Sequence, residues 1–125
     1  MRLLLDTHAF LWWLDDNPTL SANARSAIRN PENEVYVSAA TAWEIAIKKK
    51  LGKLKAPAGL ARELDSHNFA PLSISFEHAL AVETLPDHHD DPFDRILVAQ
   101  AIAEGLTLVT RDEIIHKYRV NILEA

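Results

Sequence analysis

The stretch DPFDRILVAQAIAEGLTLVT, residues 91–110, joins a helix signal to a strand signal without a gap. Pro92 is typical of a first helical turn and Gly105 of a helix end, and apolar residues repeat between them at helical spacing. The run LTLVT that follows, residues 106–110, is short, apolar and partly β-branched, as a buried strand is. A helix that leads directly into a buried strand is typical of α/β proteins.

The same alternation extends over the rest of the chain. Further strands are expected at 2–6, 34–38, 71–75 and 119–123, and further helices at 9–16, 21–30, 41–52, 57–67 and 76–85. Strands that alternate with helices predict a parallel sheet covered on both faces. We therefore expect an α/β fold, a three-layer α/β/α single domain over residues 1–125 around a central parallel sheet of four to five strands.

The composition limits the functional classes. A chain of 125 residues with 48% hydrophobic and 25% charged residues is an ordinary globular protein, large enough to bury its own core. It has no cysteine, which excludes disulfides and thiolate metal sites and suits the cytoplasm. Its apolar runs fall short of the roughly 20 residues that cross a membrane, so no membrane association is expected. The net charge of −5 means that binding to nucleic acid must depend on a local basic patch or on metal ions.

Four acidic residues are expected at one edge of the sheet. Asp6 ends the first strand, Asp112 follows the strand at 106–110, and Glu44 and Asp94 lie near the starts of two helices. In open parallel sheets the ligand site lies at the carboxyl ends of the strands. If the topology is as expected, the four carboxylates meet there.

Each of these acids also has a simpler explanation in helix capping. Asp6 can cap the first helix, Asp91 the helix from Pro92, and Asp112 the short turn after it. Thr41 and Glu44 have the spacing of a capping box. A protein in which the acids serve only as caps would be a non-catalytic binding module.

The four acids together are harder to explain by capping. Two charges about 4 Å apart interact by about 4 kcal/mol at an effective dielectric constant of about 20. Carboxylates this close raise one another's pKa values or bind a cation. Oxygen ligands without cysteine, and without histidines spaced for zinc, favour Mg²⁺ or Mn²⁺. Such a site can activate water and stabilise the charge that develops on a phosphodiester.

Four segments resemble the PIN domain, specifically the VapC toxins of bacterial VapBC toxin–antitoxin pairs: LLLDTHAFLWWL (3–14), SAATAWEIAIKKKLGKL (38–54), DDPFDRILVAQA (90–101) and LVTRD (108–112). The resemblance implies a Mg²⁺- or Mn²⁺-dependent endoribonuclease, usually a homodimer, that is inhibited by a cognate VapB-type antitoxin. It also implies that the catalytic, metal-binding quartet is Asp6, Glu44, Asp94 and Asp112, supported by the hydroxyls of Thr7 and Thr110.

Other residues near the quartet allow more than one interpretation. Asp91 is either the helix N-cap or a further group beside the metal. Arg95 and Arg111 are expected either to pair with the acids or to contact the scissile phosphate. Lys48 and Lys49 are either a solvated helix end or a weak RNA-binding edge.

His88 and His89 are expected to be solvated loop residues, because adjacent histidines in a polar loop usually are. Trp12, Trp13 and Trp43 are expected in the core or at an interface. The main alternative from another class is a receiver-like signalling domain that binds Mg²⁺ through its own carboxylate pocket. That alternative fits poorly, because the chain has no acidic pair after the first strand and no lysine after the last.

Overall fold

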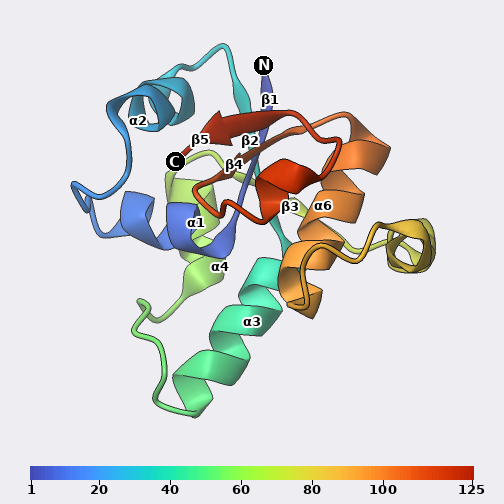
Figure 1. Cartoon of the computed structure of the whole chain (residues 1–125). Coiled ribbons are helices and arrows are strands. Elements are labelled where there is room, and N and C mark those ends of the chain that lie inside the picture. The colour runs from blue at the N-terminus through green and yellow to red at the C-terminus, as the bar shows by residue number, and fades with distance from the viewer.

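A five-stranded parallel sheet forms the centre of the computed structural model, which describes residues 1–125 (Figure 1). Its strands run in the order β3-β2-β1-β4-β5. The strand bounds are β1 Arg2–Leu5, β2 Glu34–Ser38, β3 Ala70–Leu72, β4 Thr107–Thr110 and β5 Ile122–Glu124. The α/β class, the parallel sheet and the expected number of strands are confirmed.

Every expected helix is present, with small changes in its bounds: α1 Thr7–Leu14, α2 Ala22–Arg29, α3 Ala39–Lys50, α4 Leu60–Ser66, α5 Phe76–Ala81 and α6 Pro92–Glu104. The segment expected as one helix over 76–85 divides into α5 and a 3₁₀ turn, η1 Val82–Thr84, and a second such turn, η2, spans Ile115–Lys117. None of these helices is both long and apolar enough to cross a membrane.

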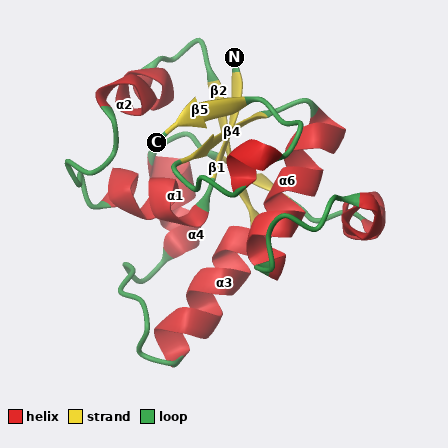
Figure 2. Ribbon diagram, viewed as in Figure 1, coloured by secondary structure: helices red, strands yellow, loops and turns green.

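The helices cover both faces of the sheet, as the three-layer arrangement requires (Figure 2). Side chains alternate between the two faces along a strand. In β1, Leu3 and Leu5 therefore belong to one core cluster and Leu4 to the other, and all three are fully buried. Helices α1 and α2 pack on the Leu3 side, and α6 packs on the Leu4 side.

The strand order places β1 between β2 and β4. The chain adds β2 and β3 on one side of β1 and then adds β4 and β5 on the other side, so the order of the strands reverses between β1 and β4. This reversal is a topological switch point, where open α/β sheets bind their ligands. The order also differs from the 2-1-3-4-5 order of flavodoxin-like sheets. Because receiver domains have that flavodoxin-like order, the sheet does not support the receiver alternative.

Candidate metal centre

The four predicted acids line one cavity of about 460 Å³ at the carboxyl edge of the sheet. Asp6 follows β1, Asp112 follows β4, Glu44 lies on α3 after β2, and Asp94 lies in the first turn of α6. The predicted convergence of the carboxylates therefore occurs in the structure. The first turn of α6 also lies at this carboxyl edge, so the segment 86–91 brings the chain back to it.

Asp6 is both a helix cap and a wall of the cavity. Its Oδ1 accepts a hydrogen bond of 2.8 Å from the main-chain N–H of Ala9, and Thr110 donates a side-chain hydrogen bond to the same carboxylate. Burial raises the pKa of Asp6 above its usual value, although these hydrogen bonds act in the opposite direction. Capping therefore explains part of what this carboxylate does, and leaves it facing the cavity.

Glu44 caps no helix, and the capping box predicted with Thr41 is wrong. The N-cap of α3 is Ser38, so Glu44 lies in the second turn, too far along for its carboxylate to reach the N-cap amide. Its Oε1 accepts a 2.6 Å hydrogen bond from Thr7, and Lys48 donates to its Oε2. This buried carboxylate is held by side chains from two helices.

Asp91 and Asp94 have separate roles at the start of α6. Asp91 is the N-cap, and its Oδ1 accepts hydrogen bonds from the main-chain N–H groups of Phe93 at 2.8 Å and Asp94 at 3.4 Å. Asp94 makes no capping bond. Burial, followed by the charge of Asp91, raises the pKa of Asp94 to about 7. Asp91 is therefore the cap, and Asp94 is the carboxylate whose negative charge is left least compensated.

Asp112 is fixed through both carboxylate oxygens. Oδ1 accepts from the main-chain N–H of Ile114 at 2.8 Å, and Oδ2 lies 2.8 Å from Nε2 of His89. Burial would raise the pKa of Asp112, but the hydrogen bonds from His89 and Ile114 outweigh it, so the pKa lies below its usual value. Its main-chain N–H donates to Thr110, the hydroxyl that also bonds Asp6.

The prediction that His89 is a solvated loop residue is wrong. Its Nε2 lies between two carboxylates, 2.8 Å from Asp112 and 3.1 Å from Asp94. Burial lowers the pKa of His89, but the hydrogen bond to Asp112 and the charges of nearby acids outweigh it and raise the pKa above its usual value. The one sequence signal for this position is that His89 directly precedes the acidic run at 90–94.

Arg95 does not pair with the metal-site acids, and its contact with the scissile phosphate stays a prediction. Its guanidinium donates to the main-chain oxygens of Val82 at 2.9 Å and Pro86 at 3.0 Å, and to the hydroxyl of Tyr118 at 3.3 Å. Arg95 therefore braces the loop that leads into α6, and its charge is used there and not against the metal-site acids.

Lys48 and Arg111 are the lysine and the arginine on the cavity wall. Lys48 lines the cavity and donates to Glu44, which raises the pKa of Lys48, so it belongs to the site although it lies toward the end of α3. Arg111 donates to the main-chain oxygens of Thr19 and Ala125 and lies over the ring of Trp12. Lys49 is exposed and does not line the cavity.

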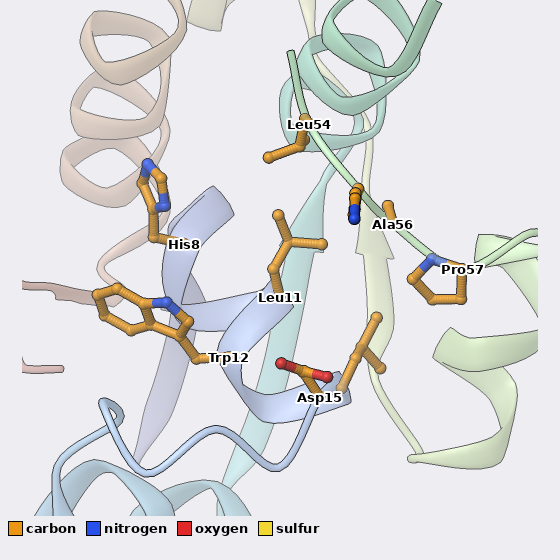
Figure 3. A pocket seen from close by; sticks show the side chains of 9 residues that line it. His8, Leu11, Trp12, Asp15, Leu54, Ala56 and Pro57 are labelled. Atoms are coloured by element: carbon orange, nitrogen blue, oxygen red, sulfur yellow. The ribbon is translucent and has the colours of Figure 1, made fainter. Parts of the chain in front are cut away.

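A second, mostly apolar cavity of about 550 Å³ adjoins the acidic one (Figure 3). Residues of α1, including Leu11, line it on one side, and Leu54, Ala56 and Pro57 line it on the other. His8 and Trp12 border both cavities. A molecule bound in the apolar cavity therefore lies beside the carboxylates.

The acidic cavity has the donor set that a divalent cation requires. A carboxylate oxygen of Asp94 and one of Asp112 lie within 4.8 Å of each other and of a ring nitrogen of His89, and the Asp6 and Glu44 side chains share the same cavity. The charges of Asp91, Asp6 and Asp112 each raise the pKa of Asp94, so these negative groups repel one another in the metal-free protein. A bound cation would remove that repulsion.

Comparison with known proteins agrees with this geometry. A family model described as PIN domain matches residues 3–121, nearly the whole chain. The ribonuclease VapC22 of Mycobacterium tuberculosis is 28% identical over 120 residues, which cover 94% of this chain and 92% of that protein.

Two solved structures share the fold at low sequence identity. The crystal structure of VapBC2 from Rickettsia felis, bound to a DNA fragment from its promoter, matches with a TM-score of 0.71 at 20% identity, over 99% of this chain and 98% of that chain. A toxin–antitoxin complex from Klebsiella pneumoniae matches with a TM-score of 0.65 at 21% identity, over 98% of this chain and 96% of that chain.

Proposed function

The chain belongs to the PIN domain family. We propose that it is a metal-dependent endoribonuclease, the toxin of a toxin–antitoxin pair. The observation that carries the proposal is the cavity in which Asp6, Glu44, Asp94 and Asp112 meet from four separate parts of the sequence. The similarity to a protein named a ribonuclease supports RNA as the substrate.

Capping alone does not account for this cavity. Asp6 and Asp112 accept main-chain N–H groups, but Glu44 and Asp94 cap nothing and are still held at the same place. Capping therefore does not explain why both carboxylates lie in this cavity, and the repulsion of Asp94 by Asp91, Asp6 and Asp112 would be unfavourable in a module that binds no cation. In the catalytic interpretation, both Glu44 and Asp94 are metal ligands.

The ion we propose is Mg²⁺ or Mn²⁺, held by Asp6, Glu44, Asp94 and Asp112. Carboxylate oxygens are the ligands that these hard cations prefer. When bound, the cation supplies Lewis-acid stabilisation of the charge that develops on the phosphodiester and lowers the pKa of a coordinated water.

The protein's own contribution is to hold this arrangement of charges in place before RNA arrives. Thr7 orients Glu44, and Thr110 contacts both Asp6 and the main-chain N–H of Asp112. Lys48 offsets the charge of Glu44 and offers the nearest ammonium to an entering phosphate. Preorganised charges stabilise a transition state without having to reorganise during the reaction.

The proposed partners are RNA, a cognate VapB-type antitoxin and a second copy of the chain. Two structures that share the fold come from toxin–antitoxin systems, which supports the antitoxin. The apolar cavity beside the carboxylates offers such an inhibitor a surface from which it would block access to them. A toxin that cuts cellular RNA acts in the cytoplasm, which is the location we propose.

Asp94→Asn should abolish RNA cleavage, whereas Asp91→Asn should retain most of it. The first change removes a proposed metal ligand, and the second keeps a good N-cap, because asparagine caps helices about as well as aspartate. Cleavage of a labelled RNA by the purified full chain in Mg²⁺ or Mn²⁺ measures both.

Melting temperatures of both variants in the absence of metal serve as the control for folding. The reverse order of activities would show that Asp91, and not Asp94, is the ligand. No cleavage by the parent, together with no Mn²⁺-dependent rise in its melting temperature, would leave only the capping module.

A further inference from the structure

We propose that His89 is a positioning residue of this site: its imidazole is fixed in one tautomer and orients the Asp112 carboxylate beside Asp94. The inference rests on the proposed function, because it concerns how two of the proposed metal ligands are held. The resemblance that identifies the quartet assigns no role to this histidine.

The tautomer follows from the hydrogen bonds on the two sides of the ring. The main-chain N–H of Asp91 donates to Nδ1 of His89 at 3.1 Å. Since Nδ1 accepts this bond, the proton of the neutral ring is on Nε2. Nε2 faces the carboxylates of Asp112 and Asp94 at 2.8 and 3.1 Å, where an N–H is the complementary group.

The main chain around His89 is also held in place. The hydroxyl of Tyr118, a buried core residue, accepts a 2.9 Å hydrogen bond from the main-chain N–H of His89. Arg95 binds the main-chain oxygens of Val82 and Pro86 in the preceding loop and also donates to Tyr118. The ring is therefore directed at the carboxylates by a braced loop and not by its own side-chain torsions alone.

This geometry favours a hydrogen-bond donor over a metal ligand. Coordination through Nε2 would require its lone pair, so the proton would have to be on Nδ1. That proton would then face the N–H of Asp91, and two donors would oppose each other. A carboxylate has about four lone-pair sites, so Asp112 can accept from His89 and Ile114 and still offer oxygen to a cation.

The consequence is a fixed orientation of Asp112. Partners that orient metal ligands in this way typically change metal affinity by about 10- to 100-fold when they are removed. His89→Ala should therefore weaken Mn²⁺ binding by that factor. His89→Gln should stay within about threefold of the parent, because the glutamine amide can donate in place of Nε2–H.

The experiment has two parts, both on the full chain. Isothermal titration with Mn²⁺ compares the parent, His89→Ala and His89→Gln, with His88→Ala as the matched control at the exposed neighbouring histidine. Long-range ¹H–¹⁵N spectra of the imidazoles, recorded without metal and then with Mg²⁺, assign the ring proton directly. We expect Nε2–H under both conditions and unchanged affinity in His88→Ala.

Four results would overturn the inference. A proton on Nδ1 in the metal-free protein would contradict the assigned tautomer. Loss of the Nε2 proton on addition of Mg²⁺, or equal losses of affinity in the alanine and glutamine variants, would make His89 a ligand. Unchanged affinity in His89→Ala would show that His89 has no role in metal binding. A parent that binds no Mn²⁺ would reject the proposed function, while the metal-free spectra would still decide the tautomer.

Discussion

At the scale of single residues, Asp94 carries the clearest electrostatic signal. Its pKa is raised to about 7 because the carboxylate is largely buried and other acids surround it. The fold therefore favours the neutral carboxyl. The contribution of Asp94 to stability is fully present below its unfolded pKa of about 3.9 and is lost as the pH rises through about 7.

Asp94→Asn should consequently stabilise the metal-free protein at pH 8 and change little at pH 4. Asparagine resembles the neutral carboxyl, and each unit of pKa shift corresponds to about 1.4 kcal/mol, so we expect a difference of about 1–4 kcal/mol at pH 8. Urea unfolding in a chelator, from pH 4 to pH 9, measures it. Asp65→Asn, at an exposed position on α4, is the control. A difference that does not vary with pH would contradict this explanation.

The roles of some residues in this region could be predicted from the sequence. The positions of strand ends and helix starts predicted that the acids converge and that Asp91 caps α6. His89 and Arg95 did not, because their partners lie in a loop whose path is set by Tyr118, more than twenty residues away. No local pattern encodes that path.

At the scale of one element, α3 depends on a single serine. Ser38 ends β2, and its buried Oγ accepts from the main-chain N–H of Ala40 at 3.0 Å and donates to Oε1 of Gln100 at 2.6 Å. It therefore begins the helix that carries Glu44 and ties that helix to α6.

Ser38→Ala should destabilise the protein by about 2–4 kcal/mol, the sum of a lost N-cap and an unpaired buried amide oxygen on Gln100. Denaturant unfolding of the purified chain measures the loss. Ser26→Ala, at an exposed position within α2, should stay within about 0.5 kcal/mol of the parent. A loss of the same size in both variants would show that Ser38 has no special role.

The start of α3 also shows why element bounds are harder to predict than element types. Thr41 and Glu44 have the spacing of a capping box, which favoured a start near Thr41. The actual cap is set by backbone conformation: Ser38 is extended, with φ −74° and ψ 148°, and the helix begins at the next residue. The last residue of β2 is therefore also the N-cap of α3.

At the scale of the whole molecule, one apolar helix face is exposed. Trp43 and Ile47 on α3, and Leu51 at its C-cap, recur at intervals of four and are 59%, 38% and 61% exposed. At one end of the row, Trp43 packs against Phe93 in the first turn of α6. The other end of the apolar row lies beside the lysines that end α3.

This row predicts a two-fold homodimer. In an isologous contact, the apolar row on one copy packs against the same row on the other. The double change Ile47→Glu and Leu51→Glu should convert the dimer to a monomer in size-exclusion chromatography with light scattering. Ile102→Glu, at an exposed residue on α6, is the control. A parent that is monomeric at all concentrations would contradict the prediction.

The layered fold and the parallel sheet were evident from the alternation of strand and helix patterns. The strand order was not, because strand pairing joins residues far apart in the chain, such as Leu4 with Tyr36 and Leu108. The position of the site was predictable without that order, since the carboxyl ends of all parallel strands lie at one edge.

The central position of β1 bears on how such sequences can diverge. β1 is hydrogen-bonded on both sides and covered on both faces, whereas the outer strands β3 and β5 have three residues and one neighbour each. Replacements can accumulate at the periphery while Asp6 keeps its place at the middle of the sheet. A chain only 20% identical can then retain the architecture, as the TM-score of 0.71 with the Rickettsia felis complex illustrates.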